Sequence, residues 1–315
     1  MKILLLGANG QIGFELLRTL APFGEVVAAT RSGKLADGTL CQRADLDHPP
    51  SLARALDDAN AEIIVNAAAY TAVDRAEDEP ERADRVNHRA VGEIGDWAAR
   101  HGALVVHYST DYVFDGRATQ PYREDDPTAP LGVYGRSKLA GDEALRASGA
   151  AHLVFRTAWV YAARGNNFLR TMLRLGAKSE ELRIVADQIG APTPAGLIAD
   201  ATLTALAHWR DADAQARGAL AGVYHMVAGG QCSWYDFANA IIVEATAREV
   251  LAHAPAVVPI ATVDYPTRAR RPAYSVLDSA KLASTFGLQL ADWREGMRAV
   301  LGEVAAHTLP SQPSP

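Results

Sequence analysis

The first twenty residues constrain the fold more than any other part of the chain. Residues 2–6 are mostly apolar and predict a short buried strand. Gly7, Gly10 and Gly13 follow, and residues 14–20 have the spacing of an amphipathic helix. Glycines at such a turn let the backbone approach a pyrophosphate, whose charge meets free amides and the positive end of the helix. The segment therefore predicts a dinucleotide site, although its spacing differs by one residue from G-x-G-x-x-G.

Strand-like and helical segments alternate along the rest of the chain. Residues 153–156 form a further expected strand, and 222–227 form another after a long excursion. Such alternation predicts an α/β fold, a doubly wound parallel sheet of the Rossmann type covered on both faces. The earlier strands are expected at 26–29, 63–69 and 104–109, and the helical segments between them include 51–59 and 81–100.

Prolines at 191–194 and 266–272 interrupt the less regular second half. They predict a smaller substrate domain interleaved with late elements of the first domain. We expect the cofactor-binding domain at 1–155, with roughly 176–200 and 222–250. The substrate domain is then expected at roughly 156–175, 201–221 and 251–309, and 310–315 is expected to be a frayed tail.

Composition favours an enzyme of the cytoplasm. The chain has 315 residues, 49% of them hydrophobic, which is enough for a proper core. Cys41 and Cys232 have no paired spacing, so neither a disulfide framework nor a zinc site is expected. No apolar run reaches the roughly 18 residues that span a bilayer, so no membrane partner is expected. A net charge of -6 argues against nucleic acid as a partner.

Tyr134 and Lys138 are the strongest catalytic candidates. A phenol with a pKa of about 10 is a poor acid near neutrality unless a neighbouring cation favours the phenolate. Four residues on a helix bring Lys138 to the same face, so we expect its ammonium to stand beneath the ring oxygen of Tyr134. This spacing is common on ordinary helices, so support from other motifs is needed.

That support comes from residues that end the expected strands, where ligands bind in open α/β sheets. Residues 66–71 place small side chains where a ribose or nicotinamide could pass. Asp45 could accept a hydrogen bond from the adenine amino group, and Leu46 could face the adenine ring. Residues 107–111 deliver the hydroxyls of Ser109 and Thr110 to a third strand end.

Together these motifs resemble the extended short-chain dehydrogenase/reductase superfamily. Within it, five segments are similar to dTDP-4-dehydrorhamnose reductases, and the match runs nearly the full chain. The resemblance implies reduction of the 4-keto group of dTDP-4-dehydro-L-rhamnose to dTDP-L-rhamnose, in dTDP-rhamnose biosynthesis. The partner is then a dTDP-sugar, and the protein is compatible with a homodimer. The segments are residues 109–116, 134–141, 156–161, 187–193 and 269–272.

The resemblance also implies a role for each site residue. Tyr134 gives its proton to the sugar oxygen, and Lys138 lowers the pKa of the phenol and holds the nicotinamide ribose. Thr110 donates a hydrogen bond to the developing alkoxide, and Asp111 orients or tunes that hydroxyl. Trp159 stacks on the sugar or walls it off. The cofactor-binding candidates are Gly7, Gly10, Gln11, Ile12, Gly13, Thr30, Arg31, Asp45, Leu46, Ala68, Ala69, Tyr70, Thr71, Tyr108, Tyr134 and Lys138.

Several assignments keep alternatives. Ser109 competes with Thr110 for the catalytic hydroxyl, because neighbouring side chains of a strand point to opposite faces. Asp111 is equally consistent with bracing a turn, and Trp159 with core packing. The guanidinium groups at 268, 270 and 271 could clamp a diphosphate or stay solvated. His107 is interpreted as a satisfied core histidine.

The cofactor preference follows from one departure from NAD-binding folds. These folds carry an acid at the end of the second strand, whereas this chain has Thr30 and Arg31. Arg31 or Arg18 could meet a 2'-phosphate, which favours NADPH, with NADH as the alternative. Family members are associated with Mg²⁺, but no carboxylate spacing marks a site, so no metal ligand is assigned.

Single residues distinguish the reductase from rival functions. Sugar-nucleotide 4,6-dehydratases carry a motif that resembles Thr-Asp-Glu after the same strand. In this chain the third residue of that motif is Tyr112. An epimerase/reductase would need a thiol in a site motif, and neither cysteine lies in one. A reductase for another 4-keto sugar nucleotide remains an alternative. So does a non-catalytic NADP-binding regulatory subunit, because a related protein serves another enzyme in that way.

Overall fold

A seven-stranded parallel sheet forms the centre of the molecule. The computed structural model describes residues 1–308, and the strand order is β3-β2-β1-β4-β5-β6-β11. The order reverses at β1, which confirms the predicted doubly wound sheet and creates a crevice beyond the carboxyl ends of β1 and β4. The strands are β1 (Lys2–Leu6), β2 (Glu25–Thr30), β3 (Gln42–Arg43), β4 (Ile63–Asn66), β5 (Leu104–Thr110), β6 (Ala151–Thr157) and β11 (Gly222–His225).

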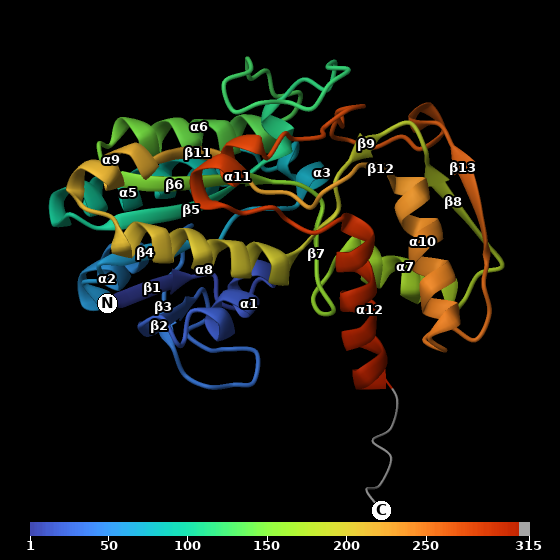
Figure 1. The fold of residues 1–315 in the computed structure, drawn as a ribbon, viewed down its shortest axis with the longest axis horizontal. Coiled ribbons are helices and arrows are strands. Elements are labelled where there is room, and N and C mark those ends of the chain that lie inside the picture. Colours follow the sequence, from blue (N-terminus) through green and yellow to red (C-terminus); the bar gives the residue numbers. More distant parts are fainter. Residues whose placement is uncertain (309–315) are drawn as a thin grey trace, which may run out of the picture.

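Helices cover both faces of this sheet because alternate strand residues point to opposite sides (Figure 1). Ile3 and Leu5 pack with one set of helices, whereas Leu4 and Leu6 pack with the other. The first set comprises α1 (Gln11–Thr19), α8 (Ala195–Asp211) and α11 (Ala280–Phe286), and the second comprises α2 (Pro49–Ala59), α5 (Ala90–His101) and α6 (Val133–Ala147). Apolar burial on both faces holds the strand ends in fixed positions.

A smaller unit lies beside the sheet, on the right in Figure 1. Its separate apolar core joins three helices to the β8–β13 pair, which is parallel. Two short pairs connect this unit to the rest of the chain, β7 with β10 and β9 with β12. The elements are α7 (Phe168–Gly176), α10 (Trp234–Ala247), α12 (Trp293–Thr308), β7 (Val160–Tyr161), β8 (Glu181–Val185), β9 (Ile189–Gly190), β10 (Thr193–Pro194), β12 (Cys232–Ser233) and β13 (Ala256–Ile260).

Short helical pieces connect the longer elements. The expected helix over 81–100 is continuous but begins as α4 (Pro80–Asp84) and passes through a π-helical turn, η1 (Arg85–Arg89), before α5. Such π turns are frequent at functional sites. The other pieces are α3 (Val73–Ala76), the 3₁₀ turns η2 (Asp111–Val113) and η3 (Thr262–Asp264), and α9 (Ala214–Leu220), which packs beside β6.

The division into a cofactor-binding and a substrate domain stays a prediction. Packing groups two segments differently from the expected boundaries, however. Helix α8, expected in part within the substrate domain, packs against α1 and the sheet. Helix α10 and strand β8, expected with the cofactor domain, share the core of the smaller unit. The expected tail, 310–315, lies outside the described residues.

Within residues 1–308, no helix combines the length and apolar character needed to cross a membrane.

Candidate active site

The glycine turn has the close packing that a pyrophosphate cradle requires. Gly7 has a φ of +80°, and a Cβ there would lie 2.7 Å from the amide nitrogen of Ala68. A Cβ on Gly13 would lie 2.1 Å from the Gly7 carbonyl oxygen, so helix and turn touch through bare backbone. Gly10 begins α1 without a side-chain cap. The exposed helix start therefore fits the phosphates of a dinucleotide.

Side chains at the start of α1 connect the two units. The Asn167 amide donates a hydrogen bond of 2.8 Å to the Gln11 side chain, and the Gln11 amide reaches the Val160 carbonyl at 3.5 Å. Ile12 packs against the sheet core. The contacts of Gln11 and Ile12 with the cofactor stay predictions, and the main-chain amides of the helix start are available to a phosphate.

The end of β2 carries an exposed arginine, Arg31. The buried Thr30 hydroxyl is committed to its own turn: it donates to the Lys34 carbonyl at 3.0 Å and accepts from the Lys34 amide at 3.1 Å. Arg18 pairs with Glu15 at 3.0 Å. Arg31 is exposed, and no ion pair within the described residues engages it. A direct role for the Thr30 side chain is therefore disfavoured relative to Arg31.

Asp45 and Leu46 follow β3 at the same edge of the sheet. The Asp45 carboxylate accepts a hydrogen bond from the Asp47 amide at 3.1 Å, and Leu46 is buried. The Leu46 carbonyl accepts a hydrogen bond of 3.0 Å from Arg85. The pair lies where the sequence placed it, and its contact with adenine stays a prediction.

Sequence analysis missed Asn87, a buried residue of the π turn that ties three elements together. Its side-chain oxygen accepts from the Tyr70 amide at 2.8 Å, and its amide group donates to the Tyr70 carbonyl at 3.0 Å and to Ser137 at 3.1 Å. Tyr70 donates to Glu79 at 3.0 Å. The loop of predicted cofactor residues Ala68, Ala69, Tyr70 and Thr71 is thus fixed to α6, with side chains that remain partly or fully exposed.

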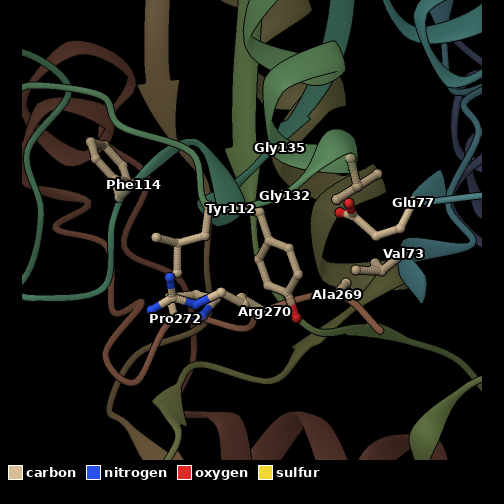
Figure 2. A pocket seen from close by; sticks show the side chains of 11 residues that line it. Val73, Glu77, Tyr112, Phe114, Gly132, Gly135, Ala269, Arg270 and Pro272 are labelled. Atoms are coloured by element: carbon tan, nitrogen blue, oxygen red, sulfur yellow. The ribbon is translucent and has the colours of Figure 1, made fainter. Parts of the chain in front are cut away.

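A cavity at the start of α6 brings Gly132 and Gly135 together with Ala269, Arg270 and Pro272 of the late part of the chain (Figure 2). Tyr134 also lines it. Tyr134 is half-buried and meets the Tyr112 ring edge-to-face, with centroids 5.7 Å apart. Glu77 accepts a hydrogen bond of 2.7 Å from the Val133 amide and so caps the helix that carries Tyr134. The cavity is lined by Val73, Glu77, Tyr112, Phe114, Leu131, Gly132, Tyr134, Gly135, Ala269, Arg270 and Pro272.

Thr110 ends β5 and Asp111 begins η2, just before Tyr112 of the cavity wall. The Thr110 hydroxyl donates to the Asp111 carboxylate at 3.0 Å, and both residues are buried. Burial raises the pKa of Tyr134 to about 12, and hydrogen bonding by Thr110 opposes this rise. Ser109 donates to Asp142 at 2.8 Å inside the core. Of the two competing hydroxyls, Thr110 is therefore the one that faces the phenol.

Lys138 lies in a different place from the one expected. Its side chain is 1% exposed, and Nζ donates to the Tyr108 carbonyl at 2.6 Å and lies 3.1 Å from Nε2 of His107. The groups that shift the pKa of Tyr134 are Thr110, Asp111 and Asp142. The strand carbonyl holds the ammonium, and the expectation that Lys138 acidifies the phenol stays a prediction.

The interpretation of His107 as a satisfied core residue is confirmed, and its neighbours form a network that sequence analysis missed. Its ring lies 3.1 Å from Asn66 and 3.1 Å from Lys138, and burial lowers its pKa well below the usual value. Asp142 and Arg156 pair at 3.4 Å within the same core. Burial lowers the pKa of Lys138 to about 8, while Asp142 opposes that change.

Tyr108 contributes only its main chain toward Lys138. Its ring is buried, and its hydroxyl lies 2.8 Å from the Thr202 hydroxyl in helix α8. A contact between the Tyr108 side chain and the cofactor is therefore disfavoured, because the ring points into the core.

Trp159 is held between two residues of the smaller unit. Its indole stacks on Trp234, with centroids 3.4 Å apart and planes within 7°. A Cβ on Gly190 would lie 2.5, 2.7 and 2.8 Å from three adjacent indole atoms, which places Gly190 over the other face. The Trp159 φ of +47° is rare for a large side chain. Because Trp234 covers one face of the indole, a sugar could stack only on the part of the other face that Gly190 leaves open, and the role of Trp159 stays a prediction.

Two of the three late arginines are already paired. Arg268 forms an ion pair with Asp78, and Arg271 donates to Asp74 at 2.7 Å. Arg270 is exposed and lines the cavity with Tyr134 (Figure 2). The paired arginines fix the segment, which leaves Arg270 as the guanidinium available to a ligand.

Within residues 1–308, no group of three or more histidine, cysteine or acidic residues is arranged to hold a metal ion. Cys41 and Cys232 are both free thiols.

Comparisons with known proteins agree with this geometry. A family model described as RmlD substrate binding domain matches residues 1–306. The dTDP-4-dehydrorhamnose reductase of Burkholderia thailandensis is 52% identical over 300 residues, covering 93% of this chain and 96% of the relative. The enzyme of the same name from Escherichia coli is 44% identical over 308 residues, covering 98% and 99%.

Solved structures extend the likeness to the fold. The dTDP-4-dehydrorhamnose reductase of Bacillus anthracis, in complex with NADP, has a TM-score of 0.84 at 32% identity and covers 96% of this chain and 100% of its own. A Thermus thermophilus UDP-glucose 4-epimerase has a TM-score of 0.80 at 19% identity, covering 98% and 100%, and shares the fold alone. The chain therefore belongs to the RmlD substrate binding domain family, together with the dTDP-4-dehydrorhamnose reductases of Burkholderia and Escherichia.

Proposed function

We propose that this protein reduces the 4-keto group of dTDP-4-dehydro-L-rhamnose to give dTDP-L-rhamnose, with NADPH as the preferred reductant. The protein is an oxidoreductase of its family, and relatives up to 52% identical carry the name of this reaction. The observation that supports the residue assignment is that Tyr134 lines a cavity and that the Thr110 hydroxyl, which donates to Asp111, affects the pKa of its phenol.

The chain supplies a proton, a hydrogen bond and a binding surface. A bound reduced nicotinamide supplies the hydride. Tyr134 donates its proton to the sugar oxygen, and Thr110 stabilises the developing alkoxide with its hydroxyl. Lys138 has three N–H donors and two neighbours, Tyr108 and His107, so one donor is left for the nicotinamide ribose.

Arg270 is the residue we assign to the substrate's diphosphate. Arg268 and Arg271 are held by Asp78 and Asp74, which anchor the segment on either side of it. A planar guanidinium matches two phosphate oxygens in a bidentate contact. We further propose a cytoplasmic location and a homodimer, and light scattering after size-exclusion chromatography tests the second.

The Tyr134→Phe variant tests the reductase assignment. We expect it to keep cofactor binding and to lose turnover by roughly two to four orders of magnitude, the usual contribution of a positioned proton donor. Loss of NADPH absorbance on addition of the substrate measures turnover, and fluorescence titration measures cofactor binding. Near-normal turnover would reject the role of Tyr134. If the unaltered protein binds NADPH but consumes none, the regulatory-subunit alternative is favoured.

Arg31→Ala tests the cofactor preference. Removing a cation that contacts a 2'-phosphate costs about 1.5 kcal/mol or more, so we expect KM for NADPH to rise about tenfold or more. KM for NADH should stay unchanged, because NADH lacks that phosphate. Arg18→Ala is the matched control, since Arg18 is already paired with Glu15. Equal effects on both cofactors would place the discrimination elsewhere.

A further inference from the structure

Gln11 contacts both units of the molecule at the turn where a dinucleotide phosphate is expected. It is the first residue of α1, whose start has no side-chain cap, so its main-chain N–H is one of the free amides there. Its side chain reaches the smaller unit. Oε1 accepts a hydrogen bond of 2.8 Å from Asn167, and Nε2 lies 3.5 Å from the Val160 carbonyl oxygen. One residue therefore joins the expected phosphate site to the smaller unit.

The loop over residues 162–167, here called the connecting loop, contacts the same turn of α1 at further points. The guanidinium carbon of Arg164 lies 3.2 Å from the centre of the Phe14 ring, an attractive cation–π arrangement. Gly165 packs beside Gln11, because a Cβ added to this glycine would lie 3.4 Å from the Gln11 Cγ atom. The connecting loop and the first turn of α1 are therefore held together by packing as well as by the hydrogen bond.

Asn167 extends this connection to the residue expected to contact the sugar. It is the N-cap of α7, where its Oδ1 atom accepts a hydrogen bond of 3.0 Å from the Arg170 amide. The next residue, Phe168, packs against Trp234 with ring centroids 4.6 Å apart. Trp234 in turn stacks on Trp159 at 3.4 Å. A continuous series of contacts therefore runs from the start of α1 to Trp159.

The hydrogen bonds of Asn167 explain why the contact with Gln11 can respond to a ligand. The Asn167 amide has two N–H groups, but three acceptors lie within reach: Gln11 at 2.8 Å and the carbonyls of Ala162 and Arg164 at 2.9 and 3.0 Å. The two carbonyls of the connecting loop therefore compete with Gln11 for the same hydrogens. Any ligand that fixes Gln11 shifts this competition toward the bond between the two units.

We propose that the hydrogen bond between Gln11 and Asn167 couples binding of the dinucleotide to binding of the sugar nucleotide, with Asn167 as a positioning residue for Trp159. This inference rests on the proposed function, because it needs both ligands. A phosphate held by the Gln11 amide fixes the backbone of that residue and so restricts its side chain. The connecting loop and Trp159 then lose less conformational freedom when the sugar nucleotide binds, and its affinity rises.

Isothermal titration calorimetry with dTDP-L-rhamnose, without and with saturating NADPH, measures this coupling. NADPH is the suitable partner because a reduced sugar cannot react with a reduced cofactor. We expect NADPH to tighten binding of the sugar nucleotide by about tenfold, and the sugar nucleotide to tighten binding of NADPH by the same factor. Equal affinities with and without NADPH would overturn the proposal.

Two substitutions remove the bond from either side. Gln11→Met keeps the length of the side chain and a good helix former but makes no hydrogen bond. Asn167→Ser keeps an oxygen that caps α7 but has no amide. We expect each variant to lower the tenfold factor to about one, and the double variant to match them, because all three remove the same contact. General destabilisation would weaken both affinities of the sugar nucleotide and leave their ratio unchanged.

Asn166→Ser is the matched control, because Asn166 is the exposed neighbour of Asn167. It should retain the tenfold factor. Retention of that factor in Gln11→Met, or its loss in Asn166→Ser, would contradict the assignment of the coupling to this bond.

The same titrations separate this inference from the proposed function. If dTDP-L-rhamnose binds neither the free protein nor the protein with NADPH, the proposed function fails and the coupling fails with it. If dTDP-L-rhamnose binds and NADPH tightens it, but Gln11→Met leaves the factor unchanged, the proposed function stands and only the role of the bond between Gln11 and Asn167 fails.

Discussion

Two sets of charged residues near the candidate active site differ in burial. The inner set, His107, Lys138, Asp142 and Arg156, lies in the core between α6 and strands β5 and β6, with every side chain at most 4% exposed. The outer set pairs Asp74 with Arg271 and Asp78 with Arg268, where three of the four side chains are 43% exposed or more. Screening by water weakens the outer pairs, whereas a buried charge without its partner is strongly destabilising.

This difference in burial indicates that the two sets have different roles near Tyr134. The inner set fixes Lys138 against the end of β5, where we propose that it donates to the cofactor. The outer set holds residues 268–271 over the cavity, where the segment can be released at small cost. Three substitutions probe the comparison, from the largest expected effect to the smallest.

Lys138→Met should have the largest effect on catalysis. It removes the donor that we assign to the nicotinamide ribose and leaves the Tyr108 carbonyl without its 2.6 Å partner. We expect both cofactor affinity and turnover to fall, the latter by roughly a hundredfold. Steady-state kinetics with direct NADPH titration measures the two separately. A loss confined to binding would show that Lys138 has no influence on the chemical step.

Arg156→Leu should have the largest effect on stability. It leaves the Asp142 carboxylate without its cation and removes the guanidinium that lies 5.4 Å from the Phe114 ring. Breaking one partner of a buried pair costs about 3–5 kcal/mol. Urea denaturation measures the free energy of unfolding. The double variant with Asp142→Leu should recover part of this loss, and failure to recover any would mean that the pair is not the cause.

Asp74→Ala should have a small effect that depends on salt. The pair with Arg271 is partly exposed, so its loss should cost about 1 kcal/mol or less and raise KM for the sugar nucleotide a few-fold. Although burial raises the pKa of Asp74, hydrogen bonds from Arg271 and Ala269 hold it below its usual value. The contact is therefore fully present at neutral pH and lost only as pH falls below about 4. Hydrogen exchange of residues 266–272 reports the release, and Arg268→Ala is the matched comparison. Unchanged exchange in both variants would refute the anchoring role.

Local sequence determined much of the framework. The glycines at the first turn, the alternation of apolar strands with helical segments and the hydroxyls at the end of β5 each depend on neighbouring residues. The structure places the glycines and the hydroxyls at the carboxyl edge of one sheet. The order of these elements along the chain was enough to predict a doubly wound fold and a dinucleotide site.

The directions of single side chains were decided by contacts between distant segments. Helical spacing put Lys138 on the face of Tyr134, yet the carbonyl of Tyr108, thirty residues away, determines where its ammonium points. Trp159 follows β6, but Trp234 and Gly190 cover both of its faces. Asp74 and Asp78 form ion pairs with two of the three late arginines, which lie almost two hundred residues further along the sequence.

The sequence by itself thus determined which chemical groups this protein has and the edge of the sheet where they gather, because strand and helix periodicity act over a few residues. Only the tertiary structure decided which of these groups are buried, which are paired and which remain free. Burial and partner choice depend on packing between remote segments, and these set the pKa of Asp111 and Tyr134 and the freedom of Arg270.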